Sequence, residues 1–148
     1  MPLPVLAVFF LLIVISLPYA EESRGSIVLK IHGFRNNKGK ARILLFSADE
    51  KEYFPSEHKK AYKAHIIPVE NQEATFAFRD IPYGSYAISV HHDENDNGRI
   101  DSNLFKIPRE GLGASNDAKG SFGPPSYDKA EIKLNNETLE VEINMVYP

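Results

Sequence analysis

The amino-acid sequence predicts an all-β protein: a single antiparallel β-sandwich of about seven strands with one long ordered loop. Three observations lead to this fold class. Apolar and polar residues alternate with a period of two along most of the chain after residue 20, which is the pattern of half-buried strands. Turn-forming residues recur roughly every 8 to 12 positions, as they do in sandwiches. Helical periodicity is weak and confined to residues 57–65, EHKKAYKAH.

The first 20 residues are predicted to be a secretory signal peptide. They contain a long apolar run and no charged side chain, the first charge being Glu21. The run is shorter than the ~20 apolar residues that span a bilayer comfortably, and the helix-breaking Pro18 comes just before the small Ala20, which favours cleavage after Ala20. An uncleaved N-terminal anchor helix is the alternative. We therefore expect export to the periplasm or the extracellular space, with no membrane attachment of residues 21–148 after cleavage.

The composition limits the class of protein further. Residues 21–148 are enough for one domain with a substantial core. The chain has no cysteine, so an exported form must be stabilised by its core or by a bound ion rather than by disulfides. The net charge is −3, and charges of both signs are scattered along the chain. No basic patch interleaved with aromatic residues indicates a nucleic-acid partner.

Each predicted strand places its apolar residues on one face. The strands are expected within residues 26–33, 39–48, 61–70, 73–81, 84–92, 129–135 and 138–147. The segment 34–40, FRNNKGK, is predicted to be a hairpin turn between the first two strands, because Asn and Gly tolerate positive φ. The residues expected to face the core are Ile27, Leu29, Ile31, Ala41, Ile43, Leu45, Ala74, Phe76, Phe78, Tyr86, Ile88, Val90, Leu139, Val141, Ile143 and Met145.

A long irregular segment, residues 93–127, interrupts this pattern and is rich in glycine and proline. A loop of that length in a compact domain is usually functional or disordered, and the many acidic and amide side chains at its start favour a functional role. Its later part, GSFGPPSYD (residues 120–128), is predicted to fold back as a rigid cover anchored by Phe122 and Tyr127. Binding of a sugar or peptide by the exposed aromatic residues of the loop is the alternative.

The start of this loop, DENDNGRID, follows the pattern of a calcium-binding loop, D-x-[DN]-x-[DN]-G. Alternate side chains of a tightly curled loop converge on one point, Ca²⁺ prefers six to eight oxygen ligands, and Gly98 permits the sharp turn. Ile100 is expected to pin the loop to the core. The predicted metal ligands are Asp93, Asn95, Asn97, the backbone carbonyl of Arg99, and Asp101.

The calcium pattern is incomplete, because Leu104 stands where the full pattern has a bidentate glutamate. Water or another carboxylate would supply the missing oxygen, and the carboxylates available are Glu94, Glu110, Asp117 and Asp128. Incomplete loops of low charge bind calcium weakly, with dissociation constants on the order of 10⁻⁴ to 10⁻³ M. The alternative is a turn rich in Asn and Asp that holds no ion.

Two neighbouring histidines precede the loop. In a strand, His91 and His92 point to opposite faces, so they do not bind one ion together. His92 with another histidine or a carboxylate would form a transition-metal site, which is the basis for an alternative reading as a metal-dependent enzyme. A structural role for both histidines is the simpler interpretation. A triad of Ser115, His92 and Asp117 has no supporting motif, and no catalytic residue is predicted.

Several short motifs follow one another between residues 81 and 130. They are P-x-G-x-Y-A at 82–87, HDEN-x-NG-x-x-D at 92–101, IP-x-E at 107–110, SN at 115–116 and FGPP at 122–125. Together they resemble the bacterial domain-of-unknown-function 2141 family of small exported proteins. Two positions depart from the family pattern: Lys106 stands where a glycine is usual, and Ala114 where an aromatic residue is usual.

The resemblance implies a bacterial origin, one extracytoplasmic β-sandwich domain and no assigned activity. The P-x-G-x-Y motif is also similar to Ig-like sandwiches of the transthyretin-like and collagen-adhesin repeat type, which are binding or spacer modules. We therefore expect a non-enzymatic extracytoplasmic binding or structural module with a protein or small-molecule partner, whose long loop is ordered by weakly bound Ca²⁺. The alternatives are a metal-free ligand-binding module, a metal-dependent enzyme that uses His92, and a purely structural envelope protein.

Overall fold

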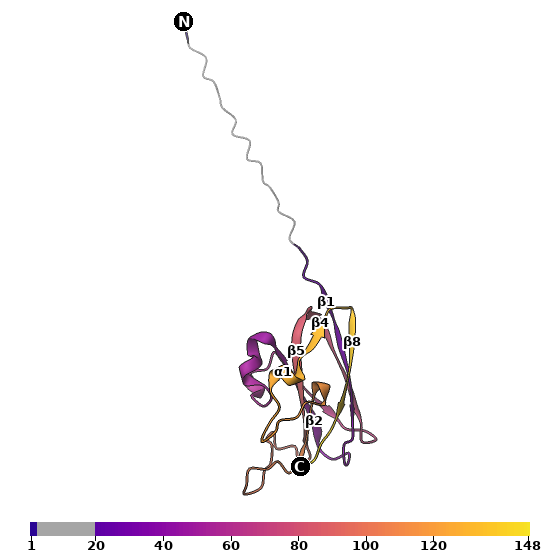
Figure 1. The fold of residues 1–148 in the computed structure, drawn as a ribbon. Coiled ribbons are helices and arrows are strands. Elements are labelled where there is room, and N and C mark those ends of the chain that lie inside the picture. Colours follow the sequence, from indigo (N-terminus) through magenta and orange to yellow (C-terminus); the bar gives the residue numbers. More distant parts are fainter. Residues whose placement is uncertain (3–19) are drawn as a thin grey trace.

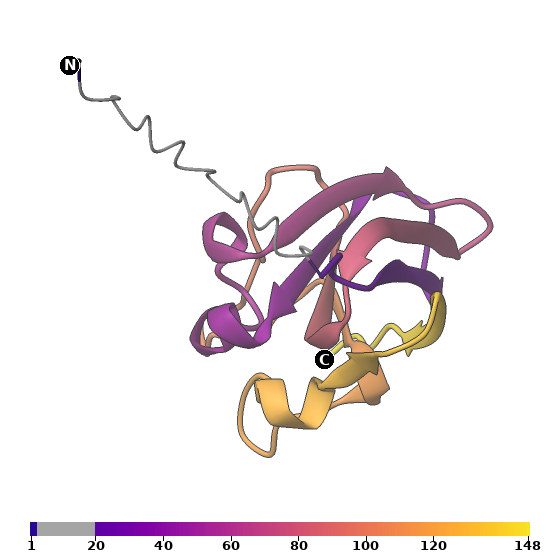
Figure 2. The ribbon, with the colours of Figure 1, turned by 90° about the horizontal axis from the view of Figure 1, so that it is seen from above.

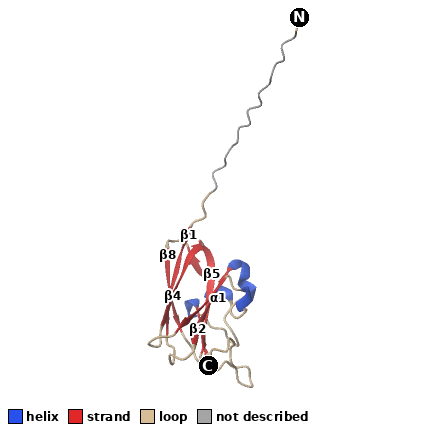
Figure 3. Ribbon diagram, turned by 180° about the vertical axis from the view of Figure 1, so that it is seen from behind, coloured by secondary structure: helices blue, strands red, loops and turns tan. Residues whose placement is uncertain are grey.

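The computed structural model describes residues 1–2 and 20–148. The signal peptide predicted over residues 1–20 therefore lies almost entirely outside the described residues. The described part forms eight strands in two sheets, in agreement with the predicted β-sandwich (Figures 1 and 3). The strands are β1 Arg24–His32, β2 Lys40–Ser47, β3 Lys63–Pro68, β4 Ala74–Pro82, β5 Gly84–Asp93, β6 Gly111–Ala114, β7 Ile132–Leu134 and β8 Thr138–Asn144.

The two sheets differ in size. The smaller one has the order β4-β1-β8, and the larger one has the order β3-β2-β5-β6, with β7 also paired to β5. Most neighbours are antiparallel, but β1 and β8 run parallel. Parallel pairing between the first and last strands brings both ends of the domain into one sheet. Seen from above, the yellow last strand lies beside the indigo first strand (Figure 2).

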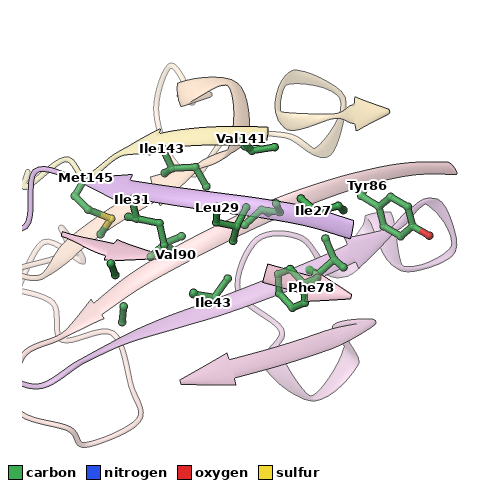
Figure 4. Close-up of a cluster of buried hydrophobic side chains, with 14 of the residues drawn as sticks. Ile27, Leu29, Ile31, Ile43, Phe78, Tyr86, Val90, Val141, Ile143 and Met145 are labelled. Atoms are coloured by element: carbon green, nitrogen blue, oxygen red, sulfur yellow. The ribbon is translucent and has the colours of Figure 1, made fainter. Parts of the chain in front are cut away.

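The core lies between the layers and is built from the predicted inward faces. The three isoleucine and leucine side chains of β1 point toward the larger sheet, where Ile43 of β2 and Val90 of β5 lie, and Ile143 of the neighbouring strand β8 lies beside them (Figure 4). The alternation arises because successive strand residues point to opposite faces, so every second residue is buried. The predicted core residues that are buried are Ile27, Leu29, Ile31, Ala41, Ile43, Leu45, Ala74, Phe78, Tyr86, Ile88, Val90, Val141, Ile143 and Met145. Phe76 and Leu139 are half-buried and pack against this core.

The hairpin predicted at residues 34–40 is wrong. β1 pairs with β4 and β8, while β2 pairs with β3 and β5, so this segment crosses from one sheet to the other. Its glycine is required by close packing rather than by a hairpin turn. A Cβ on Gly39 would lie 1.8 Å from the backbone carbonyl oxygen of Asp93, and Gly39 also has a φ of +63°.

The P-x-G-x-Y motif has a structural explanation at the start of β5. The hydroxyl of Tyr86 donates to the carbonyl oxygen of Pro82 at 2.7 Å, and Gly84 lies under the same tyrosine ring. The tyrosine therefore fixes the turn between β4 and β5 from within the core. Because Tyr86 is also buried, burial raises the pKa of its phenol to about 12.

Short helices cover one part of the outer face of the larger sheet. They are η1 Ala48–Tyr53, η2 His58–Lys60, η3 Ser115–Asp117 and α1 Tyr127–Ala130. A second, smaller core lies beneath them and includes Phe46, Ala114 and Tyr127. The weak helical pattern at 57–65 thus ends after one turn and continues as β3. No helix among the described residues has the length and hydropathy to cross a membrane.

Candidate functional site

The short helices leave part of the outer face of the larger sheet uncovered. This part forms an open groove of about 1140 Å³. The segment 93–127 supplies much of the groove lining. This segment is not the one continuous loop that the sequence predicted. β6 and η3 interrupt the segment and attach its middle to β5. Two loops without regular secondary structure remain, residues 94–110 and 118–126. The first projects from the end of the sandwich opposite the start of β1 (Figures 1 and 3). Residues from both loops line the groove.

Strand register explains the floor of the groove. Ile66 of β3 pairs with Arg42, Arg42 with His91, and His91 with Leu112. These four side chains therefore form one row across the outer face, which an isolated bridge extends from Leu112 to Val146. All five line the groove. The floor is apolar at both ends of the row and polar in the middle.

The walls carry large apolar side chains that the sequence predictions placed elsewhere. Ile100 does not reach the core as expected: it is 39% exposed and lines the groove. Phe122 does not anchor the second loop: it is fully exposed at the groove, whereas Tyr127 is buried as predicted. Phe105, which is 84% exposed, and Ile107 complete the apolar walls. Several large apolar residues exposed around one concavity are typical of an interaction site.

Leu104 and Phe105 are neighbours in one tight turn, Asn103–Ile107, but only Phe105 lines the groove. Asn103 holds the turn, because its side-chain oxygen accepts hydrogen bonds from the backbone N–H groups of Phe105 and Ile107 at 2.9 and 3.0 Å. Lys106 has a φ of +61°. This left-handed conformation favours glycine, so a lysine is strained there.

The predicted calcium loop, Asp93–Asp101, forms part of the groove wall through Gly98, Arg99 and Ile100. The side chain of Asp93 is fully buried and accepts hydrogen bonds from the backbone N–H groups of Asn97 and Gly98 at 3.1 and 2.8 Å. It also accepts one from Nε of Arg42 at 2.5 Å. Burial alone would raise the pKa of Asp93, but these donors outweigh it and lower the pKa. Gly98, with a φ of +77°, supplies the predicted sharp turn.

Three of the predicted metal ligands converge. Nδ2 of Asn95 lies 2.6 Å and Nδ2 of Asn97 lies 3.1 Å from the Asp101 carboxylate. This half of the loop offers a hard cation one carboxylate and two amide oxygens, provided that the amide groups turn over. The other half fits less well, since Arg42 already neutralises Asp93. Among the described residues, no three His, Cys, Asp or Glu side chains are grouped as a metal site. The calcium site stays a prediction.

Three of the four carboxylates considered as additional calcium ligands, all except Asp128, have other partners in the structure. Glu94 forms an ion pair with Arg35 at 2.5 Å and accepts a hydrogen bond from Asn36 at 2.8 Å. The hydrogen bond from Arg35 is the main reason why the pKa of Glu94 falls to about 2. Asp117 accepts two hydrogen bonds from Asn144, and Asp128 lies on α1.

Glu110, considered from the sequence as an additional calcium ligand and as the end of the IP-x-E motif, is a buried junction. Its carboxylate lies 2.7 Å from Nε2 of His91 and accepts hydrogen bonds from the backbone N–H groups of Glu94 and Asp101 at 3.0 and 3.1 Å. It therefore joins β5 to both ends of the Asp93–Asp101 loop. A carboxylate held by several donors in this way fixes a loop without a metal ion.

His91 and His92 point to opposite faces, as predicted. His92 is fully buried, with Nδ1 at 2.7 Å from the Tyr147 hydroxyl and Nε2 at 2.7 Å from the Lys38 carbonyl oxygen. A carbonyl oxygen only accepts, so Nε2 carries the proton and Nδ1 accepts from Tyr147. Burial raises the pKa of Tyr147 and keeps its hydroxyl protonated. Both nitrogens of His92 are thus engaged in structural hydrogen bonds, in line with the simpler interpretation.

The Ser115, His92 and Asp117 set does not assemble. The hydroxyl of Ser115 is fully buried, donates to the carbonyl oxygen of Ala130 at 2.5 Å and accepts from the N–H of Ile88 at 3.0 Å. It therefore ties β5 to the end of α1. Within the described chain, each member of the set has other hydrogen-bond partners, and none is bonded to another member.

The groove and the motifs can be compared with known proteins. A family model described as an uncharacterised protein conserved in bacteria, DUF2141, matches residues 29–142. This range contains six of the eight strands in full, parts of β1 and β8, the Asp93–Asp101 loop and nearly all of the groove. No match was found among curated proteins or among solved structures.

Proposed function

Because the chain belongs to the bacterial DUF2141 family, whose description assigns no activity, we propose its function from the site: it is an exported, non-enzymatic module that binds an apolar ligand in the groove. The observation that carries this proposal is the groove itself. Its volume exceeds the roughly 300–1,000 Å³ of typical small-molecule pockets. Its walls expose Phe105, Ile107 and Phe122 on loops that are tied to the sandwich.

A ligand that covers exposed apolar side chains of this kind binds favourably, because the apolar surface leaves water. Burial of one Phe or Ile side chain contributes roughly 1.5–3 kcal/mol, so a ligand that covers several of them binds without a strong polar contact. The turn around Phe105 is held by Asn103, and therefore little order remains to be acquired on binding. A groove with apolar walls of this type supports a binding role.

The experiment is a titration of the purified chain from residue 21 with Nile red, a neutral apolar dye whose fluorescence rises on binding. Phe105→Ser is expected to weaken the dye affinity about tenfold or more. Leu104→Ser is the matched control: it removes a side chain that is 97% exposed, in the same turn, but outside the groove. Equal affinity in both variants and the parent, or no dye binding at all, would contradict the proposal.

A second proposal concerns the wall formed by Asp93–Asp101, where we infer a weak Ca²⁺ site. Its support is the convergence of Asn95, Asn97 and Asp101 and the loop pattern itself. When bound, the ion would hold these oxygens together and stiffen the wall. At 100 times its dissociation constant, Ca²⁺ would stabilise the fold by about 2.7 kcal/mol, which raises the melting temperature by roughly 5 to 12 °C. A melt in EDTA and in millimolar Ca²⁺, Mg²⁺ or Zn²⁺ tests this: no shift, or a shift with Zn²⁺ alone, would contradict it.

A further inference from the structure

The charges around the groove do not resemble those of the whole chain. The protein has a net charge of −3, yet the groove is lined by four cationic side chains, Arg42, Arg99, Lys106 and Lys119, against one acidic side chain, Asp117, and the terminal residue Pro148. A groove lined by one sign of charge raises the local concentration of ligands of the opposite sign. The surplus is therefore a property of the site rather than of the composition.

Three of these cations are available to a ligand. Arg42 is engaged by Asp93 and Asp96, and Asp117 by Asn144. Arg99, Lys106 and Lys119 are exposed, and none of them forms an ion pair with any part of the chain that the structure describes. They lie on the two loops that form the walls, beside the exposed apolar residues.

We propose that the ligand of the groove is an anionic amphiphile, with an apolar body that lies on Leu112 and Phe105 and one acidic head group that meets Arg99, Lys106 and Lys119. A long-chain carboxylate is the simplest molecule of this class. Apolar contact supplies most of the affinity, and the three cations select the negative head over a neutral one. This inference rests on the proposed apolar-ligand function and adds the charge of the ligand to it.

The test compares dodecanoate with dodecanol, which have the same chain length and differ in the charged head. Each is titrated below its aggregation limit as a competitor of Nile red. Dodecanoate is expected to bind about tenfold more tightly, because each exposed ion pair adds only a small contribution and three of them add up to about that factor. The preference is expected to shrink at high salt. It is also expected to disappear in the triple variant Arg99→Gln, Lys106→Gln, Lys119→Gln.

The matched control is the triple variant Lys51→Gln, Lys59→Gln, Lys133→Gln, which changes the net charge equally at exposed positions outside the groove. It is expected to keep the preference. Equal affinity for both competitors, with Phe105→Ser still weakening the dye, would overturn the inference and leave the proposed function standing. Failure of both competitors and of the dye would overturn the two together.

A third arm distinguishes a free amphiphile from a membrane surface. The protein is sedimented with phosphatidylglycerol vesicles, with and without Leu104→Ser. Binding to vesicles that depends on Leu104, without binding of free dodecanoate, would overturn the inference in favour of docking to a bilayer, since Leu104 projects outside the groove. Binding of free dodecanoate that is unaffected by Leu104→Ser supports the groove.

Discussion

Nε of Arg42 lies 2.5 Å from Oδ2 of Asp93, whose side chain is fully buried at the end of β5. The arginine comes from the neighbouring strand β2. Its positive charge lies against the carboxylate that would bind Ca²⁺ at the first position of a calcium loop. The protein thus carries a cation of its own at the first residue of the Asp93–Asp101 loop. Competition between Arg42 and Ca²⁺ for one carboxylate follows from this arrangement.

Arg42→Gln is expected to lower the free energy of unfolding by about 3 kcal/mol, because it leaves a buried carboxylate without its counter-charge. If the calcium proposal holds, the variant gains more stability from millimolar Ca²⁺ than the parent does, since Asp93 is then free for the ion. Urea unfolding with EDTA or Ca²⁺ measures both quantities. Arg79→Gln, an exposed position on β4, is the control, and an equal Ca²⁺ response in both proteins would count against the competition.

The Arg35–Glu94 pair makes stability depend on pH. The pKa of Glu94 falls from its ordinary value of 4.5 to about 2 in the folded state. A depressed folded-state pKa gives stability that is present above 4.5 and is lost as the pH falls toward 2. Arg35→Gln is therefore expected to be less stable than the parent at pH 7, with a difference that shrinks between pH 4.5 and 2. Urea unfolding across this range checks it.

The matched control for that prediction is Arg24→Gln. Arg24 pairs with Asp80, whose side chain is 77% exposed, so water screens the pair. We expect a small difference from the parent with little pH dependence over the same window. A stability gap for Arg35→Gln that stays constant from pH 7 to pH 2 would show that Glu94 gains nothing from its arginine.

Tyr147→Phe is expected to destabilise the fold by about 1–3 kcal/mol, because it removes the donor to Nδ1 of the fully buried His92. It also removes the acceptor for the backbone N–H of Arg35. Thermal unfolding measures the loss. Tyr62→Phe, on a tyrosine that is 37% exposed, serves as the control and is expected to change little. Equal stability of the two variants would mean that His92 finds another donor.

Lys106→Gly is expected to raise stability slightly, by about 0.5 kcal/mol. Relief of the left-handed conformation at φ +61° gains roughly 1–2 kcal/mol, and the added freedom of the unfolded chain takes back roughly 0.4–1 kcal/mol. Lys119→Gly offers the contrast, since no left-handed strain is relieved there and a small loss is expected. Melting temperatures of the two variants should therefore move in opposite directions, and a shared fall would contradict the explanation.

Sequence periodicity was sufficient for the core and for seven of the eight strands, but it missed β6, which lies within the segment predicted to be a loop. β1, β5 and β8 alternate with period two, and each has one buried face, so local sequence alone determines which residues point inward. The partners of these strands could not be predicted from local sequence. The segment 34–40 has the residues of a hairpin turn, but the partner of each strand depends on contacts far away in the chain, and the segment instead crosses between sheets.

The site was predicted in part. The Asp93–Asp101 pattern identified a curled loop with Gly98 at its turn, and the loop forms part of the groove wall. Arg42 and Leu112 were not foreseen as groove residues, because they come together only through strand register. Ile100 was predicted to pin the loop to the core because of its place in the calcium-loop pattern, and Phe122 to anchor the second loop, but both are exposed at the groove. Apolar residues that serve a ligand look the same in sequence as those that serve a core.

The two ends of the domain are far apart, with the start of β1 at one end of the sandwich and Pro148 at the other, where it lines the groove (Figure 1). A purification tag after Pro148 would therefore compete with any molecule at the groove mouth. Immobilisation through residue 21 would instead hold the sandwich by its far end and turn the groove toward the solution. Any binding assay on a sensor surface should use that orientation.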